Sequence, residues 1–178
     1  MQYRDSKDWL ETPKKILKVN HAGEFGAICI YRAQIAIGKL FGRDYVPLLE
    51  SFLSDETRHL GIFWEEIQRR GGVKCKSYWL CGAGGWAMGF VSALFGKSGV
   101  MACTWAVESV VTSHLQAQLT YLQSKNDTQA FEAVRAILDD EANHRDLGAK
   151  EGGTHLLYAP LRFCIAAFTE LTIRFGMR

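Results

Sequence analysis

The chain has 178 residues, nearly half of them apolar, and a formal net charge of +2. That length suits a single domain with a sizeable core, and the small charge argues against nucleic acid as a bulk partner. Its five cysteines are odd in number and include no CxxC motif, which makes a poor disulfide or zinc framework and is typical of a reducing compartment.

The first residues are charged and contain no apolar stretch, with acids at Asp5, Asp8 and Glu11. This composition differs from that of a signal peptide, and early acids disfavour an organelle transit peptide. We therefore expect a bacterial cytoplasmic chain, or one that has already been processed.

Helical periodicity dominates the rest of the chain, and no stretch alternates as a strand would. Gly42 marks a turn, Gly71 and Gly72 mark a helix end, and Asp127 or Thr128 is a suitable N-cap. Two further segments are apolar, and we expect them to form accessory helices. The sequence thus predicts one domain over residues 1–178, with core helices at about 13–40, 47–70, 99–123 and 128–151 and accessory helices at about 79–96 and 156–175.

Two Glu-x-x-His motifs carry the chemistry, one formed by Glu56 and His59 and the other by Glu141 and His144. A spacing of three residues places both side chains on one helix face, so each motif could bind a metal ion from a single helix. One such motif alone is a weak signal, because Glu and His are common on exposed helix faces.

Two further glutamates strengthen the signal. Glu24 and Glu56 are equidistant from the first turn, and Glu108 and Glu141 are equidistant from the turn at Ser124. Each antiparallel hairpin therefore brings one lone Glu level with one Glu-x-x-His motif. Two packed hairpins then give four Glu and two His at one level, which is the ligand set of ferritin-like di-iron carboxylate proteins.

The residue types fit this chemistry, because carboxylate and imidazole ligands suit iron and six shared ligands leave positions open for dioxygen. The same ligands do not exclude manganese. The sequence therefore predicts an all-α, ferritin-like four-helix bundle with additional short membrane-facing helices. We expect two iron ions per chain and the ligands Glu24, Glu56, His59, Glu108, Glu141 and His144.

Two aspartates are candidates for the surroundings of the metal ligands. Asp55 and Asp140 each precede a motif Glu, from where they could hydrogen-bond the motif His of the facing helix and fix its orientation. An ordinary place on the helix surface is the equal alternative for both. Arg58 could pair with buried carboxylates or face solvent.

Other candidates lie on the same helices as the lone glutamates. His21, three residues before Glu24, could adjoin the site or donate protons, with an exposed surface position as the favoured alternative. Tyr31, two turns after Glu24, is expected near the site, with plain core packing as its alternative. His114 lies about 120° around the helix from Glu108, so we do not expect the two to bind the same ion.

The accessory segments raise the question of a membrane. No run reaches the roughly 18–20 apolar residues that a spanning helix needs. The tryptophans, phenylalanines and nearby lysines of residues 74–97 suit a helix lying in the membrane interface. The alternative is that both accessory helices cover the bundle core.

Three stretches of the sequence resemble a known family. Residues 19–27, which read V-N-H-A-G-E-F-G-A, and residues 94–108 and 139–148 are similar to signatures of the demethoxyubiquinone hydroxylases of ubiquinone biosynthesis. The resemblance runs from about residue 17 to 152, and all six predicted ligands match. One departure is Leu115, where the family commonly has a tyrosine.

The resemblance implies that two irons activate dioxygen and hydroxylate the ring of a polyprenylated benzoquinone. A reduced pyridine nucleotide or a reductase would supply electrons. It also implies peripheral attachment to a membrane, here the cytoplasmic face of a bacterial inner membrane, and a lipid quinone substrate. We expect self-association, and a lipid-binding accessory protein of ubiquinone biosynthesis is a candidate partner.

Two other functions stay open at this point. The chain could be another ferritin-like di-iron oxidase, such as a ferroxidase or a tRNA hydroxylase. It could also be a non-enzymatic, membrane-attached helical adaptor. Iron accumulation well beyond two ions per chain, salt-sensitive RNA binding, or a melting temperature indifferent to chelator would favour these alternatives in turn.

Overall fold

The computed structural model describes residues 13–177, and within this range it is helical and contains no strand. The all-α prediction is therefore confirmed. The charged residues that disfavour a signal peptide lie outside the described range. The elements in chain order are α1 (Pro13–Leu40), α2 (Val46–Arg69), α3 (Tyr78–Ala93), α4 (Gly96–Ser124), α5 (Thr128–Gly148), the π-helical turn η2 (Ala149–Gly153), the 3-10 turn η3 (Leu156–Tyr158) and α6 (Ala159–Met177).

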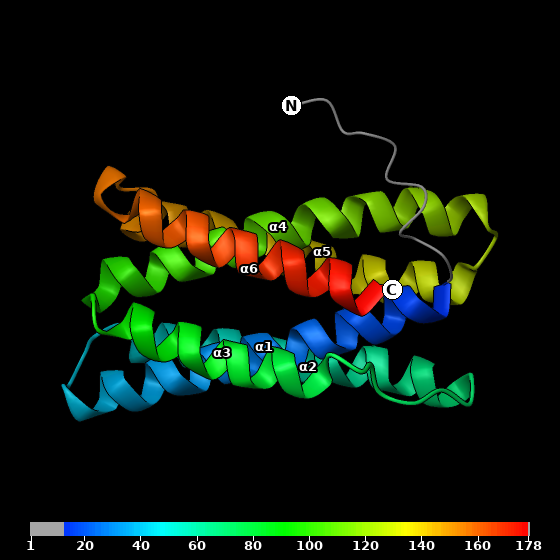
Figure 1. The fold of residues 1–178 in the computed structure, drawn as a ribbon, viewed down its shortest axis with the longest axis horizontal. Coiled ribbons are helices and arrows are strands. Elements are labelled where there is room, and N and C mark those ends of the chain that lie inside the picture. Colours follow the sequence, from blue (N-terminus) through cyan, green and yellow to red (C-terminus); the bar gives the residue numbers. More distant parts are fainter. Residues whose placement is uncertain (1–12, 178) are drawn as a thin grey trace.

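The long helices run along the long axis of the molecule as two hairpins, α1 with α2 and α4 with α5 (Figure 1). The hairpins meet where α2 packs against α5, and α3 and α6 add to this four-helix core by packing mainly on α1 and α4. Two bounds differ from expectation. α4 begins at Gly96 rather than near residue 99, and α5 ends at Gly148 because a π-helical turn follows, in which Gly152 has a φ of +99°.

Local chemistry sets the helix ends. A proline occupies the first turn of α2, where its missing N–H costs no hydrogen bond. Asp127 is the N-cap of α5, because its carboxylate accepts a hydrogen bond of 3.1 Å from the backbone N–H of Ala130. The same carboxylate accepts two hydrogen bonds of 2.7 Å from the guanidinium of Arg70. This bidentate contact joins the end of α2 to the start of α5.

α3 approaches α1 closely because glycines occupy its inner face. Gly82, Gly85 and Gly89 recur at helical spacing, and a Cβ added at Gly85 or Gly89 would collide with a backbone carbonyl of α1. The outer face of α3 carries the exposed rings of Trp79 and Trp86. α3 therefore covers the bundle with its glycine face, as one of the two alternatives predicted, and presents aromatic side chains outward. Contact of this outer face with a membrane stays a prediction.

α6 lies along α4, and its end reaches α1 (Figure 1). The helical stretch Leu156–Met177 is long and apolar enough to span a membrane by length and composition, with little of it buried. The expectation that no segment reaches this length was wrong, because Arg162, Glu170 and Arg174 are spaced too widely to interrupt a long apolar window. α6 packs along α4, and its buried residues are Ile165 and Met177.

The glycine face of α3 yields a stability prediction. In Gly85→Ala the new methyl group meets the carbonyl oxygen of Gly26, so α3 must move away from α1. Overpacking of this kind costs about 1–3 kcal/mol, and we expect the melting temperature to fall by about 2–10 °C in calorimetry.

Gly61→Ala is the matched control, because a Cβ at Gly61 in α2 meets nothing within 4 Å. There the higher helix propensity of alanine should stabilise the protein by about 0.5–1 kcal/mol. Equal stability of the two variants would contradict the close α1–α3 approach.

Candidate metal centre

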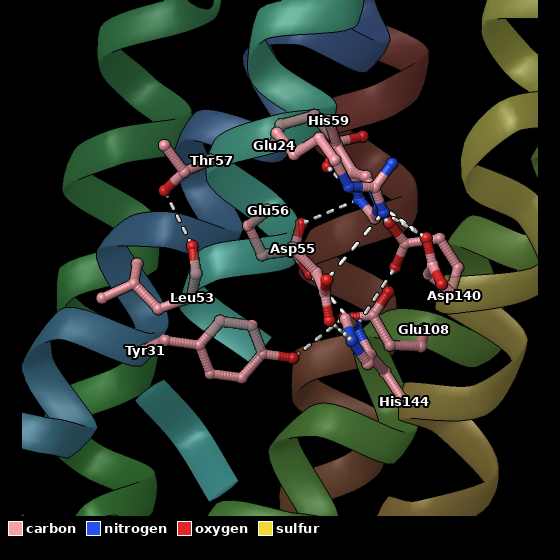
Figure 2. Close-up of polar contacts among 12 residues, drawn as sticks. Glu24, Tyr31, Leu53, Asp55, Glu56, Thr57, His59, Glu108, Asp140 and His144 are labelled. Carbon is pink, nitrogen blue, oxygen red and sulfur yellow. Dashed lines mark hydrogen bonds and ion pairs between the residues drawn. The ribbon is translucent and has the colours of Figure 1, made fainter. Parts of the chain in front are cut away.

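The six predicted ligands converge in the middle of the bundle, where all of them are buried. Each of the four core helices contributes, α1 and α4 with one glutamate and α2 and α5 with one Glu-x-x-His motif. We call this group the cluster; it consists of Glu24, Glu56, His59, Glu108, Glu141 and His144. Figure 2 labels all of them except Glu141.

His59 is surrounded by carboxylates on one side of its ring. Its Nδ1 lies 2.8 Å from Glu141, 3.6 Å from Glu24 and 3.7 Å from Glu56. One potential ligand atom from each of these four residues lies within 4.8 Å of the others. A single metal ion could therefore be held by residues of α1, α2 and α5.

His144 and Glu108 extend the cluster along α4 and α5. His144 Nδ1 lies 3.3 Å from Glu56 and 3.9 Å from Glu141. Glu108 interacts electrostatically with Glu141 as well. Glu56 and Glu141 thus face both histidines, while Glu24 lies at the His59 end of the cluster and Glu108 lies toward the other end.

The hydrogen bonding of the cluster fits a metal site. Both carboxylate oxygens of Glu56, one of Glu141 and the Nδ1 atoms of His59 and His144 are buried without a hydrogen-bond partner. Buried polar atoms normally have partners, and these atoms lie close together, with His59 Nδ1 2.8 Å from Glu141 and His144 Nδ1 3.3 Å from Glu56. A bound cation would satisfy them together, and oxygen and imidazole donors suit iron or manganese.

The outer nitrogen of each histidine is held by an aspartate of the facing helix. Asp140 of α5 lies 3.2 Å from His59 Nε2, and Asp55 of α2 lies 3.2 Å from His144 Nε2. Arg58 donates a hydrogen bond to Asp140 and lies 3.9 Å from Asp55. Such outer contacts fix the orientation of a histidine so that its other nitrogen faces the cluster. We call these three residues the brace.

Tyr31 lies beside the cluster on α1. Its hydroxyl donates a hydrogen bond of 3.4 Å to Glu108 (Figure 2). Burial and the nearby charge of Glu108 raise the pKa of Tyr31 well above its usual value. The phenol therefore stays protonated at neutral pH and acts as a donor to the carboxylate.

His21 does not contact the carboxylates among its described interactions. Its ring stacks between those of Trp64 and Tyr78, with ring centroids 5.2 Å from each. It is 2% exposed, so the favoured surface position was wrong. Burial and the charge of Lys74 lower its pKa to about 4, which keeps the ring neutral at physiological pH.

Burial and neighbouring charges shift the pKa values of the acids of the cluster. Burial raises the pKa of Glu24 and of Glu108 well above the usual carboxyl range, and repulsion from neighbouring carboxylates adds to the effect. Burial likewise raises the pKa of Glu141. Burial also acts to raise the pKa of Glu56, but contacts with His144 and His59 outweigh it, so this pKa falls below its usual value.

A mostly apolar cavity leads to the cluster. It lies among α1, α3, α4 and α6 and holds about 770 Å³ of empty space, part of it open to solvent. All four cluster glutamates line it, as do Met88, Val111, Phe168 and Ile173. Leu115, at the position where a tyrosine was expected from the family resemblance, also lines this cavity and is buried.

Sequence reasoning missed one polar pair on the cavity wall. His114 is buried on α4, and its Nε2 lies 2.7 Å from a carboxylate oxygen of Glu170 on α6. The one signal in the sequence was an acid inside an otherwise apolar segment. Its partner could not be found from spacing, because the two residues lie 56 positions apart.

The raised carboxyl pKa values predict how metal removal couples to pH. A carboxyl whose pKa is raised by folding contributes stability below its unfolded pKa of about 4.3, and this stability is lost as pH rises through the folded pKa. Burial acts to lower the pKa of both cluster histidines, but contacts with the glutamates outweigh it and raise this pKa. The stability that the protonated histidines contribute is therefore also lost as pH rises, at higher pH than for the carboxyls. The lowered pKa of Glu56 affects the stability of the fold only at acidic pH.

We therefore expect the melting temperature of metal-free protein to fall between pH 5 and pH 8, by about 2–8 °C for a loss of about 1–2 kcal/mol. Protein reloaded with ferrous iron without oxygen should melt higher and show a flatter profile, because bound cations replace the protons. Calorimetry of both forms checks this. A metal-free form that gains stability toward pH 8 would contradict the geometry of the cluster.

Comparison with known proteins places the chain in a family. A family model described as "Ubiquinone biosynthesis protein COQ7" matches residues 11–176. The "NADPH-dependent 3-demethoxyubiquinone 3-hydroxylase, mitochondrial" of Dictyostelium discoideum is 31% identical over 168 residues, covering 93% of this chain and 76% of that protein. The human protein of the same name is 33% identical over 169 residues, covering 92% and 76%.

A bacterial relative is similar to the same degree. The "3-demethoxyubiquinol 3-hydroxylase" of Rhodospirillum rubrum is 32% identical over 141 residues, which cover 78% of this chain and 64% of that protein. The family match spans the whole range that contains the cluster, the brace and the cavity. This chain belongs to the COQ7 family of ubiquinone biosynthesis proteins.

Proposed function

We propose that this chain hydroxylates the ring of a demethoxyubiquinone, or of its quinol, with dioxygen in ubiquinone biosynthesis. The observation that carries the proposal is the buried cluster at the end of an apolar cavity. The cavity suits a lipid-like molecule, and the relatives named above act on this substrate class. We place the catalytic residues in the cluster.

The positions of the cluster residues support two metal ions. Glu24 and His59 lie at one end, Glu108 and His144 lie toward the other, and the remaining two glutamates face both histidines. Glu56 and Glu141 would therefore help to hold both ions, whereas Glu24 and Glu108 would each help to hold one. Four carboxylates also balance the charge of two divalent ions, which supports two irons per chain. When bound, such a pair would supply the activation of dioxygen.

The residues of the chain hold this site in place. The brace orients both histidines, and Tyr31 donates to Glu108 so that this carboxylate points toward the cluster. The apolar walls keep bulk water away from the reacting ring, which strengthens electrostatic interactions and limits side reactions. The overall reaction consumes dioxygen, two electrons and two protons and gives a ring hydroxyl and water. A reduced pyridine nucleotide or a reductase is the proposed electron donor.

A membrane is the proposed source of the substrate. The outer faces of α3 and α6 expose large apolar side chains, among them Trp79, Trp86, Phe163 and Phe175. Large exposed apolar surface marks interaction sites, and lysines near the start of α3 suit anionic headgroups. We infer peripheral attachment to the cytoplasmic face of a bacterial inner membrane. The same surface could receive a second copy of the chain or a lipid-binding accessory protein.

The apolar cavity favours this function over the other di-iron activities. A ferroxidase needs a polar route for ions rather than a cavity that suits a lipid. A tRNA hydroxylase needs a basic surface, and the net charge of the chain is only +2. A non-enzymatic adaptor leaves the unpartnered atoms of the cluster without a role.

The first test is turnover of iron-loaded protein with demethoxyubiquinone, labelled dioxygen and NADPH, followed by mass spectrometry of the quinone. We expect a gain of one labelled oxygen atom and about two irons per chain. Glu141→Ala and His144→Ala each remove a ligand and should lower the rate by more than about 100-fold. Asp140→Ala removes only an orienting contact and should cost about 10–100-fold.

Asp139→Ala is the matched control, because Asp139 is exposed and pairs only with Arg135 among the described residues. It should keep its activity and its iron. Undiminished turnover in both ligand variants would refute the assignment, and iron uptake far beyond two ions per chain would favour a ferroxidase.

The membrane proposal predicts the effect of replacing two exposed rings. Trp79→Ser combined with Trp86→Ser removes two exposed rings from the outer face of α3. Because the ring of Trp79 also contacts Phe25 and Tyr78, the melting temperature of the double variant is measured alongside binding. We expect binding to vesicles with anionic lipid to weaken by about 100-fold or more, since burial of each large apolar side chain is worth about 1.5–3 kcal/mol. Co-sedimentation measures this directly. Phe41→Ser, in the α1–α2 turn, should change binding less, and an unchanged double variant would contradict the proposed face.

A further inference from the structure

The two histidines of the cluster are held by their aspartates in different ways. His144 Nε2 lies 3.2 Å from one carboxylate oxygen of Asp55, and the other oxygen of Asp55 lies 3.9 Å from Arg58, beyond hydrogen-bond distance. On the other side, His59 Nε2 and Arg58 Nη2 both contact the same oxygen, Oδ2 of Asp140. Among the described residues, one aspartate of the brace therefore hydrogen-bonds a histidine alone, whereas the other is shared with a guanidinium.

Three atoms meet on the shared side. His59 Nε2 lies 3.2 Å from Asp140 and also 3.2 Å from Arg58 Nη2. The Nδ1 of His59 faces the carboxylates of the cluster, so Nδ1 is the nitrogen that would bind a metal ion and Nε2 carries the proton. A guanidinium has no acceptor, so the contact between the two nitrogens is not a hydrogen bond. Both N–H groups donate to Asp140.

A carboxylate oxygen that accepts from two donors is a weaker acceptor for each of them. An aspartate on the outer nitrogen of a metal-binding histidine raises the basicity of the ring. The charge-assisted bond from a guanidinium draws the negative charge of that aspartate away from the histidine, and the guanidinium itself repels a nearby cation. The ring of His59 should therefore be the poorer metal ligand, and the ring of His144 the better one.

A purely structural ion pair is the competing explanation for Arg58. Its side chain is 48% exposed and that of Asp140 is 39% exposed, and pairs of this kind contribute little to stability. The guanidinium nevertheless reaches a fully buried ring, because His59 is 0% exposed. Among the described residues, Arg58 is also the sole arginine or lysine that pairs with an aspartate of the brace. Its charge therefore acts on the cluster through one histidine only.

We propose that Arg58 makes the two metal positions of the cluster chemically unequal, because it shares Asp140 with His59 and leaves Asp55 to His144. The ion at the His59 end would be held more weakly and would be the more electron-poor of the two. This inference rests on the proposed function for the presence of two ions. Arg58 is a positioning residue, since it acts through Asp140 and His59 and contacts no reacting atom.

The test follows the N–H group of each histidine. Full-length protein with isotope-labelled histidine is loaded with zinc, a diamagnetic probe that oxygen and imidazole ligands bind, and the Nε2–H resonances are recorded by NMR. Asp140→Asn and Asp55→Asn assign the two resonances, because each weakens one hydrogen bond. In Arg58→Gln the His59 resonance should move downfield, as a stronger bond to an unshared carboxylate requires, while the His144 resonance stays in place.

Zinc affinity is the second measurement. Competition with a chelator should resolve two ions per chain of different affinity in the wild type. In Arg58→Gln the weaker ion should bind about 3–10-fold more tightly, because a positive charge near that end of the cluster has been removed. The affinity of the stronger ion should change by less than about two-fold. The two affinities should therefore approach one another.

Two control variants separate charge from packing. Arg58→Lys keeps the positive charge and should shift the His59 resonance less than Arg58→Gln does. Arg135→Gln is the matched control, because Arg135 is 47% exposed and pairs with Asp139 on the same surface of α5. It should move neither resonance. Each resonance is compared with its own wild-type position, because the ring of Phe52 lies only 4.3 Å from that of His144.

Each outcome decides the inference. An unmoved His59 resonance in Arg58→Gln overturns it, and so does weaker zinc binding, which would mean that Arg58 only holds Asp140 in place. Equal shifts of both resonances with a lower melting temperature also overturn it, since they would report a change of fold. Uptake of fewer than two zinc ions overturns it together with the two-ion site. A selective His59 shift in a protein that holds two ions but fails to hydroxylate supports it and refutes the proposed reaction alone.

Discussion

The structure depends on the burial of six titratable side chains at one level of a helical bundle. Four carboxylates and two imidazoles lie in the interior of the bundle. Each of them alone would destabilise the fold, because an unpaired buried charge costs several kcal/mol. The remaining structure manages this cost. Asp140 and Asp55 contact the outer nitrogens of His59 and His144, each from the facing helix, and Tyr31 donates a hydrogen bond to Glu108. The buried atoms without a hydrogen-bond partner lie together, where a cation could bind. The packed hairpins keep these groups at one level of the bundle, where a bound cation would offset the cost of burying them.

The core of the site could be predicted from the sequence because its geometry follows from helical repeat alone. Spacing of three residues fixes a helix face, and equal distance from a turn fixes a height in a hairpin, so Glu24 and Glu108 could be assigned from counting. The turn chemistry at Asp127 was legible for the same local reason. These features need no knowledge of how distant helices pack.

What could not be predicted depends on contacts between distant segments. The glycines of α3 are ambiguous in sequence, since small residues suit a flexible loop as well as a close helix crossing, and only the position of α1 decides. His21 was predicted at the surface because its sequence neighbours do not reveal that the rings of Trp64 and Tyr78 enclose it. The pairing of His114 with Glu170 requires the return of α6 over α4, which no periodicity encodes.

The brace sits at the boundary of the protein, with Arg58, Asp55 and Asp140 each more than one-third exposed, whereas the cavity opens among α1, α3, α4 and α6. One side of the cluster therefore lies close to solvent through the brace, whereas the other side faces the apolar cavity. Under the proposed function, metal ions would approach past the exposed acidic side chains of the brace on the α2–α5 side, and a water-insoluble substrate would enter through the cavity. A water-soluble ion and a water-insoluble substrate would thus reach the cluster from different sides and would not need a common entrance.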